Sequence, residues 1–360
     1  MQSKKNILFI NTIKGWGGGE HWHFDWASRL QKEYNVFVIG NINSKLSIKA
    51  KEKGLNLFEI KLTNFSIFNP YKWFLAFKII SEIKPNSALL NLSRELKIFT
   101  PILKYFKTKK IIYRKGSSTP IKNNFGTNLI LNYFVTDILC NSLATAEKSL
   151  IKYSNKDILA KIKIIYNSLD IEVYDNIKIK NLPKSDSFII KSIGRFTPEK
   201  NQIIFFDLAK KLINKNINFE IHIAGTGADF EAYKEKLKEE KLEKYIKLHG
   251  FVENTKEFLS NCDVFILPSK WKGFGFVKLE AMAMSIPIIA FNNSSNPETI
   301  IDHNTGYLIP ENNLEIMAEK VELLCNDPEL KINLGKNNRK YLEREFDIKI
   351  NKEKIISLID

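Results

Sequence analysis

Cysteine and histidine are both scarce in this chain. The three cysteines, Cys140, Cys262 and Cys325, lie far apart, and only five histidines occur among 360 residues. An odd, widely spaced set of cysteines argues against a disulfide framework or a zinc cluster and fits a reducing cytoplasm. No Asp-x-Asp pair occurs either. The sequence therefore implies no bound metal and no cofactor.

Long apolar runs are missing too. No run approaches the roughly 20 residues that a membrane helix needs, and the strand-like segment Ile7–Ile10 is too short for the core of a signal peptide. We expect a cytoplasmic protein. The chain is longer than the about 250–300 residues at which a single core stops growing, and 44% of its residues are hydrophobic. Two globular domains are the expected arrangement.

The excess of positive over negative charge is confined to the first half of the chain. Residues 1–170 hold 27 Lys and Arg against 11 Asp and Glu, whereas residues 171–360 hold 28 against 29. Two basic segments, 69–78 and 103–110, are rich in aromatic residues, and each is predicted to form an amphipathic helix. Their rings either pack in the core or, with the lysines, contact an anionic membrane. No nucleic-acid motif accompanies them, so no nucleic-acid partner is expected.

Apolar segments alternate with helix-like segments along the whole chain, which predicts parallel sheets covered by helices. The turn-rich segment 171–187 separates two such series. The predicted strands are Ile7–Ile10, Val36–Ile39, Leu57–Ile60, Ala88–Leu92, Lys110–Tyr113, Asp137–Cys140 and Ile162–Tyr166, then Phe188–Ile193, Phe219–Ala224, Ile246–Leu248, Val264–Leu267, Ile288–Ala290 and Gly306–Ile309. Helices are predicted over 229–243, 314–325 and 328–345.

The most informative motif is Pro268–Ala283. It follows an apolar strand, contains Gly273 and Gly275, and leads into a helix predicted to start near Phe276. Glycines let a backbone approach a ligand closely, and the N–H groups at a helix start favour an anion. A second loop, Gly194–Asn201, places Arg195 and Lys200 after another strand. At the carboxyl edge of a parallel sheet both cations could bind one diphosphate.

These motifs resemble the donor domain of glycosyltransferase family 4, the retaining nucleotide-sugar transferases of GT-B fold. Further landmarks follow in the family's order: Ala224–Gly227, His249–Val252, Pro287–Ala290, Pro297–Glu298 and Thr305–Leu308. The first half matches the family's motifs more weakly, at Gly17–Glu20 and Tyr166–Asp170. The resemblance implies two Rossmann-like, doubly wound α/β domains facing across a cleft. Residues 1–170 would bind the acceptor, 171–187 would link, 188–345 would bind the donor, and 346–360 would cross back to the first domain.

The resemblance also assigns site residues. Arg195, Lys200 and Glu280 are the expected catalytic residues, with Glu280 accepting hydrogen bonds from the nucleotide ribose. One departure from the family stands out, because Lys272 replaces the Glu that contacts the transferred sugar. Lys272 is expected to select a donor or acceptor with a negative or acceptor-rich group. The donor-binding residues implied are Gly18, Gly194, Gly225, Val252, Lys272, Gly273, Phe274, Gly275, Phe276, Val277 and Glu298.

The acceptor side departs from the family as well. Many members have a histidine near the reaction centre, but the matching segments here, 88–95 and 113–116, contain none. The expected acceptor-binding residues are Glu20, His21, Arg94, Arg114 and Lys115.

The implied function is sugar transfer from a nucleoside-diphosphate sugar to a cell-envelope glycan or glycolipid, such as a lipopolysaccharide or capsule precursor. The expected protein is metal-independent and peripheral on the inner face of the cytoplasmic membrane. A catalytically silent nucleotide-sugar-binding subunit is the alternative, favoured by the missing Glu and His. A GT-B relative that isomerises or hydrolyses nucleotide sugars is a third reading.

Overall fold

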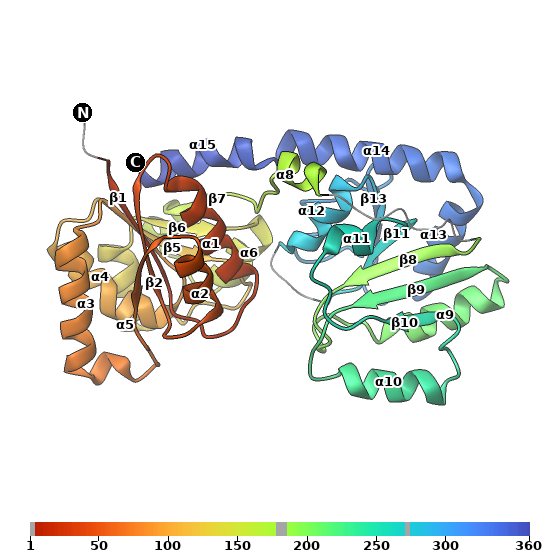
Figure 1. The fold of residues 1–360 in the computed structure, drawn as a ribbon, viewed down its shortest axis with the longest axis horizontal. Helices are drawn as coiled ribbons and strands as arrows, with labels where there is room; N and C mark the ends of the chain where they lie inside the picture. The colour runs from red at the N-terminus through yellow and green to blue at the C-terminus, as the bar shows by residue number, and fades with distance from the viewer. Residues whose placement is uncertain (1–3, 178–185, 271–273) are drawn as a thin grey trace. The chain divides into compact units, whose positions relative to one another are not determined.

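The structure is a computed structural model that describes residues 4–177, 186–270 and 274–360 (Figure 1). The chain divides into two compact units. Unit 1 comprises Met1–Tyr166 and Lys352–Asp360, and unit 2 comprises Asn167–Asn351. The division falls slightly before the boundary that the sequence places at residue 170.

The described part of unit 1 contains a parallel sheet of seven strands in the order β3-β2-β1-β4-β5-β6-β7. The apolar runs of the inner strands are buried on both faces, as helix-covered parallel strands require. The strand order reverses between β1 and β4, and ligands bind at such a reversal in open α/β sheets. The strands are β1 (Asn6–Asn11), β2 (Asn35–Gly40), β3 (Asn56–Glu59), β4 (Ser87–Leu90), β5 (Lys110–Lys115), β6 (Asp137–Cys140) and β7 (Ile162–Ile164).

Helices alternate with these strands along the chain. Several begin at a side chain that accepts a hydrogen bond from the first turn, such as Ser44, Asn69 and Ser142. The helical segments are α1 (Gly18–Leu30), α2 (Lys45–Glu52), η1 (Ser66–Phe68), α3 (Pro70–Ile83), α4 (Ser93–Tyr105), α5 (Phe125–Leu129), η2 (Ile130–Phe134), α6 (Leu143–Leu150) and α7 (Lys156–Ala160).

Unit 2 repeats the plan with six parallel strands among its described residues, in the order β10-β9-β8-β11-β12-β13. Its strand order reverses between β8 and β11. The strands are β8 (Phe188–Ile193), β9 (Phe219–Ala224), β10 (Ile246–Leu248), β11 (Val264–Leu267), β12 (Ile288–Phe291) and β13 (Gly306–Ile309). The helices are α8 (Ile171–Asn176), α9 (Ile204–Asn214), α10 (Phe230–Glu239), α11 (Thr255–Leu259), α12 (Phe276–Ala283), α13 (Leu314–Asn326) and α14 (Pro328–Glu345).

The sequence predicts that the linker 171–187 and the C-terminal segment 346–360 connect the two domains. Helix α8 occupies the start of the predicted linker, and residues 178–185 of that linker lie outside the described part. The last helix, α15 (Ile348–Ile359), begins in unit 2, and its residues from Lys352 onward count with unit 1. There Ile355 and Ile359 are buried, and the ammonium of Lys5 lies 3.0 Å from the carboxylate of Asp360.

The predicted fold class is confirmed, and one predicted helix is wrong. Both units are doubly wound parallel α/β sheets, and each predicted strand matches an observed one within two residues at either end. The segment 103–110 is not an amphipathic helix. Helix α4 ends at Tyr105, Lys107 takes a left-handed turn with φ +57°, and β5 begins at Lys110.

Candidate active site

The loops after β8 and β11 meet at the carboxyl edge of unit 2. These two strands are neighbours at the reversal of strand order, where a crevice forms beyond the strand ends. The backbone N–H of Lys270, after β11, donates to the carbonyl of Glu199, after β8, at 3.0 Å. The bond ties together the two loops that the sequence assigns to the donor.

Gly225 is required for the backbone of this edge to pack. It has φ +141°, and a Cβ at this position would lie 1.9 Å from the carbonyl oxygen of Gly194. The N–H of Gly225 donates to the carbonyl of Gly250 at 2.6 Å, and Gly194 donates to Ala224 at 2.9 Å. Gly194 and Gly225 therefore fix the position of the Arg195 loop.

Arg195 and Lys200 differ in how they are exposed. The Arg195 side chain is 74% exposed, with Nη2 3.8 Å from Oε1 of Glu199. Lys200 is partly buried. Burial and the charge of Arg195 lower the pKa of Lys200 to about 8, although Glu199 acts in the other direction. Lys200 is therefore still mostly protonated at neutral pH, so this loop offers two cations at the carboxyl edge of the sheet.

The start of α12 follows the prediction made from the sequence. Gly275 is the N-cap residue with φ +70°, and the helix begins at Phe276. The ring of Phe274 is fully buried and lies 5.4 Å from the ring of Phe346, so its side chain supports the loop from inside. Val277 lines the pocket described below. Lys272 and Gly273, both predicted donor residues, lie outside the described part of the chain.

Glu280 presents a buried carboxylate with one oxygen unused. Its Oε1 accepts a hydrogen bond from the hydroxyl of Thr255 at 2.9 Å, whereas its buried Oε2 has no hydrogen-bond partner among the residues that the structure describes. Burial raises the pKa of Glu280, and the Thr255 bond opposes that shift. The buried hydroxyl of Tyr174, on α8, lies near the same carboxylate and Thr255, and burial raises its pKa. A free carboxylate oxygen inside the protein costs energy unless a ligand donates to it.

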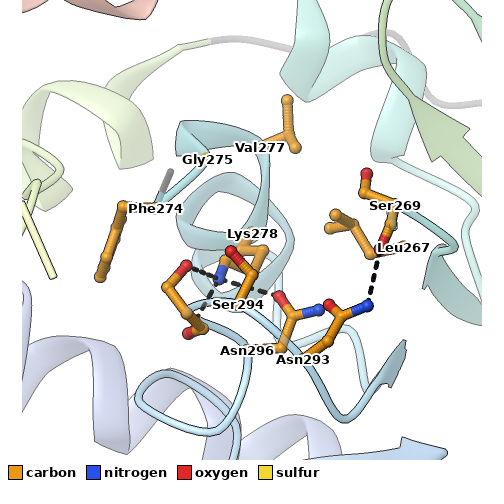
Figure 2. Close-up of a pocket in the computed structure, with 10 residues that line it drawn as sticks. Leu267, Ser269, Phe274, Gly275, Val277, Lys278, Asn293, Ser294 and Asn296 are labelled. Atoms are coloured by element: carbon orange, nitrogen blue, oxygen red, sulfur yellow. Dashed lines mark hydrogen bonds between the residues drawn. The ribbon is translucent and has the colours of Figure 1, made fainter. Parts of the chain in front are cut away.

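Lys278 is a buried cation that the sequence analysis did not single out. Its ammonium donates to Oδ1 of Asn296 at 3.1 Å and to the hydroxyl of Ser295 at 3.3 Å (Figure 2). It also donates to the hydroxyl of Thr299 at 2.8 Å. Burial lowers the pKa of Lys278 to about 7. A lysine inside the otherwise apolar start of a helix, Phe-Val-Lys-Leu, was the available signal.

Lys278 borders a pocket formed by the end of β11, the start of α12 and the loop after β12 (Figure 2). Nδ2 of Asn293 donates across it to the carbonyl of Ser269 at 3.3 Å. The lining residues are Leu267, Ser269, Phe274, Gly275, Val277, Lys278, Asn293, Ser294, Ser295 and Asn296.

The two remaining donor candidates of unit 2 lie on neighbouring loops. Glu298 follows the pocket-lining segment, and its carboxylate opposes the lowering of the Lys278 pKa. Its carbonyl accepts a 3.4 Å hydrogen bond from the hydroxyl of Tyr341. Val252 is partly buried in the loop between β10 and α11.

Unit 1 has a polar cluster at its own strand reversal. Glu20, in the first turn of α1, is buried and accepts from Nδ2 of Asn11, at the end of β1, at 3.1 Å. The Arg114 guanidinium is buried at 4.4 Å from the ring centre of Trp22 and donates to Oδ1 of Asn91, after β4, at 3.4 Å. Burial lowers the pKa of Arg114 to about 10, and Glu20 opposes that shift.

Arg94 joins this cluster through Thr12. Its Nη2 donates to the carbonyl of Thr12 at 2.8 Å. Glu95, which the sequence analysis did not select, holds the same residue, because it accepts from the N–H of Thr12 at 2.6 Å and from the N–H of Leu92 at 2.9 Å. Burial raises the pKa of Glu95 to about 7. Its position two residues after the helix start was the available signal.

The other candidates of unit 1 have different surroundings. Gly18 is the first residue of α1. His21 is exposed, with its ring 6.2 Å from that of Trp16. Lys115 donates to the carbonyl of Thr119 at 3.0 Å. The structure thus gathers Glu20, Arg94 and Arg114 and leaves His21 and Lys115 with other partners.

The described residues hold neither a metal-binding cluster nor a helix that could span a membrane. Among the described residues, no three His, Cys, Asp or Glu side chains are arranged to hold a metal ion. Within the same ranges, none of the helices combines the length and apolar character needed to cross a membrane.

Residues 173–341, which include both donor loops and Glu280, match the family model of glycosyl transferases group 1. Over this segment, a little under half of the chain, the sequence is similar to group 1 glycosyl transferases. An uncharacterized glycosyltransferase of Haemophilus influenzae is 25% identical over 348 residues, covering 93% of this chain and 94% of its own. The Escherichia coli UDP-Gal:alpha-D-GlcNAc-diphosphoundecaprenol alpha-1,3-galactosyltransferase is 29% identical over 208 residues, covering 55% of this chain and 54% of its own. This chain spans about half the length of several of the relatives that it matches.

Solved structures share the whole fold. A glycosyltransferase from Rickettsia africae superposes with a TM-score of 0.86 at 19% identity, covering 99% of this chain and 98% of that one. Anabaena Alr3699/HepE in complex with UDP gives 0.83 at 18% identity, with 98% of both chains covered. The predicted GT-B fold is confirmed. A glycosyltransferase family model that matches residues 173–341, and relatives named as glycosyltransferases, agree with the activity that the sequence predicts.

Proposed function

We propose that this glycosyltransferase moves a sugar from a nucleoside-diphosphate sugar to a cell-envelope glycan or glycolipid, with retention of the anomeric configuration. The E. coli relative is named for an acceptor linked to diphosphoundecaprenol. Solved structures of the same fold are described with UDP and with UDP-glucose. These names support the donor and acceptor classes, and the residues of this chain supply the rest of the argument.

The observation that carries the proposal is the unpartnered oxygen of Glu280. A carboxylate only accepts hydrogen bonds, and Thr255 occupies one of its oxygens. The buried Oε2 has no donor among the described residues, so it is open to a donor from a ligand. The vicinal hydroxyls of a ribose are suitable donors, so Glu280 would hold the nucleotide within unit 2.

The diphosphate would lie at the edge of the sheet where the two donor loops meet. Arg195, Lys200 and the N–H groups of residues 274–277 at the start of α12 would stabilise the charge that grows on the departing diphosphate. One preorganised donor of this kind typically contributes about 2.7–4 kcal/mol to the transition state. The acceptor hydroxyl would attack on the face of the departing phosphate, which would take its proton, and so the configuration would be retained.

Lys272 and the residues of unit 1 would set the specificity. A donor-only ammonium at 272 favours a sugar or acceptor with an anionic or acceptor-rich group. The cluster of Glu20, Arg94 and Arg114, with His21 and Lys115, is the proposed acceptor site. A lipid-linked acceptor would require the protein to work at the inner face of the cytoplasmic membrane as a peripheral protein.

The test is nucleotide binding followed by turnover. We expect nucleoside diphosphates and at least one nucleotide sugar to raise the melting temperature of the wild type, because a ligand of the native state stabilises it. In Glu280→Gln the affinity should fall about tenfold or more, as a charge-assisted hydrogen bond contributes about 1.5–3 kcal/mol. Exposed Glu239→Gln on α10 is the matched control. Transfer by Arg195→Ala should fall at least about a hundredfold.

Each other outcome has a definite meaning. Equal affinity in Glu280→Gln and the wild type would remove the assignment of the ribose site. Stabilisation by nucleoside diphosphates alone, with no sugar nucleotide bound and no transfer, would favour the silent-subunit alternative. Lys272→Glu extends the panel, since it should change which sugar nucleotide binds and leave the affinity for plain diphosphates unchanged.

A further inference from the structure

Unit 1 carries a row of exposed rings that its core does not use. Aromatic residues occur at every third position from Phe65 to Phe77, along η1 and α3. Tyr105 at the end of α4 extends the row, because its ring lies 5.8 Å from that of Phe77. All six side chains are between 43% and 82% exposed. The rings of this face are Phe65, Phe68, Tyr71, Phe74, Phe77 and Tyr105.

The row is continuous in space. Helix α3 packs against α4, and η1 contacts both helices. Figure 1 shows α3 at the outside of unit 1, with α4 between it and the sheet. On its inner side α3 buries Ala76, Ile80 and Ile83, so the helix already has an apolar side facing the core. The exposed rings are therefore a second apolar surface with another purpose.

Lysines surround these rings and acids are missing from the same segments. Residues 61–81 and 96–115 contain no Asp or Glu. Lys61, Lys78, Lys104 and Lys107 are exposed, and the ammonium of Lys72 lies 5.8 Å from the ring centre of Tyr71. A second copy of this face would bring like charges together, which disfavours self-association. Charge complementarity instead requires an anionic surface.

We propose that this face, called the aromatic-lysine face, docks on an anionic lipid bilayer. Phenyl rings enter the boundary between headgroups and acyl chains, while lysine ammoniums remain at the level of the lipid phosphates. Single-stranded nucleic acid also binds rings and cations, but four of the rings along this row are phenylalanines on a helix and the turn before it. The face needs no sugar transfer to bind, and it would bring the proposed lipid-linked acceptor to the enzyme.

Vesicle sedimentation with the full-length protein tests the proposal. The vesicles contain phosphatidylcholine with phosphatidylglycerol, or phosphatidylcholine alone. The wild type should bind the anionic vesicles, and added salt should weaken that binding. Lys72→Gln with Lys78→Gln should reduce binding about tenfold or more, since each lysine near an anionic surface contributes about fivefold. Phe68→Ser with Phe74→Ser should cause a loss of similar size.

Matched variants separate this face from general charge and exposure. Lys238→Gln with Lys241→Gln removes the same charge from exposed positions of unit 2, and Ile151→Ser removes an exposed apolar side chain elsewhere in unit 1. Both should bind as the wild type does. The proposal is overturned if the wild type ignores anionic vesicles, if the aromatic pair binds unchanged, or if single-stranded RNA competes and vesicles do not. Vesicle binding without any transfer activity would instead contradict the proposed function alone.

Discussion

Lys278 and Glu280 lie two positions apart on α12 and have different surroundings. Side chains at this spacing point about 200° apart around a helix, so Glu280 meets Thr255 and Lys278 meets the loop after β12. Both are buried, and burial moves each pKa toward the neutral form. Glu280 keeps an oxygen available for a ligand, whereas the ammonium of Lys278 is surrounded by protein oxygens. Glu280 therefore suits binding, and Lys278 suits positioning of the pocket.

The buried charge of Lys278 predicts a pH-dependent cost to stability. Its pKa is lowered from 10.5 to about 7 in the folded protein. Between those values the unfolded chain binds the extra proton, so the stability of the wild type rises with pH across this window. We expect Lys278→Met to lack that rise. The difference between the two unfolding free energies should change by up to about 1.4 kcal/mol per pH unit, measured by urea unfolding at pH 7, 8 and 9.

Exposed Lys241→Met is the control, because it removes the same charge from the turn after α10, where burial adds no cost. Its stability should follow that of the wild type across the same pH range. If Lys278→Met also ran parallel to the wild type, the ammonium would not be buried as the structure has it.

The sequence predicted the residues that are proposed to contribute chemistry and missed the buried groups that surround them. Arg195 and Lys200 belong to one motif and Glu280 to another, and each motif follows a predicted strand, so the parallel-strand pattern placed both at one sheet edge. Glu95 and Lys278 could not be assigned in this way. Their importance comes from burial and from partners distant in the sequence, such as Thr12 for Glu95, which only the folded chain brings near.

At the scale of elements, buried strands were the most predictable part. A parallel strand covered on both faces is a short, continuous apolar run, and the runs 264–267 and 288–291 are completely buried. The helix prediction for 103–110 was wrong because a mixture of lysines and rings fits both a helix surface and the start of a strand. Backbone hydrogen bonding determines the structure of this segment, since the N–H of Lys109 donates to the carbonyl of Asn86 at 3.0 Å and so brings β5 beside β4.

The turn after β9 should be intolerant of any side chain at Gly225. Its φ of +141° is nearly inaccessible to other residues, and a Cβ would lie 1.9 Å from the carbonyl of Gly194. Gly225→Ala should destabilise the protein by at least about 2–3 kcal/mol and displace the Arg195 loop. Chemical denaturation measures the first effect, and loss of stabilisation by nucleoside diphosphate measures the second.

Gly250 offers the matched comparison. It also has a positive φ, of +66°, but a Cβ there would meet nothing within 4 Å. Gly250→Ala should therefore show only the backbone cost, about 1 kcal/mol. Equal losses in the two variants would mean that the close approach to Gly194 contributes nothing.

In the molecule as a whole, the C-terminal residues belong to the unit formed by the N-terminal half of the chain. Residues 352–360 follow unit 2 in the chain, yet they complete unit 1. The resemblance to GT-B enzymes anticipated a return over 346–360, but the sequence could not locate the change at Lys352. Burial determines it, because Ile355 is fully buried and the hydroxyl of Ser87 donates to the carbonyl of Ile359.

Removing one buried side chain near the C-terminus should therefore weaken the N-terminal sheet. Ile355→Ala deletes a side chain with 0% exposure, and such a change typically costs about 2–5 kcal/mol. Hydrogen exchange read by mass spectrometry should speed up in β1–β7 and stay unchanged in β8–β13, since the cost falls on the unit that loses the contact. Ile332→Ala on α14, at 51% exposure, should leave both sheets unaffected. Faster exchange in β8–β13 of Ile355→Ala would instead show that the last helix stabilises the unit it follows in sequence.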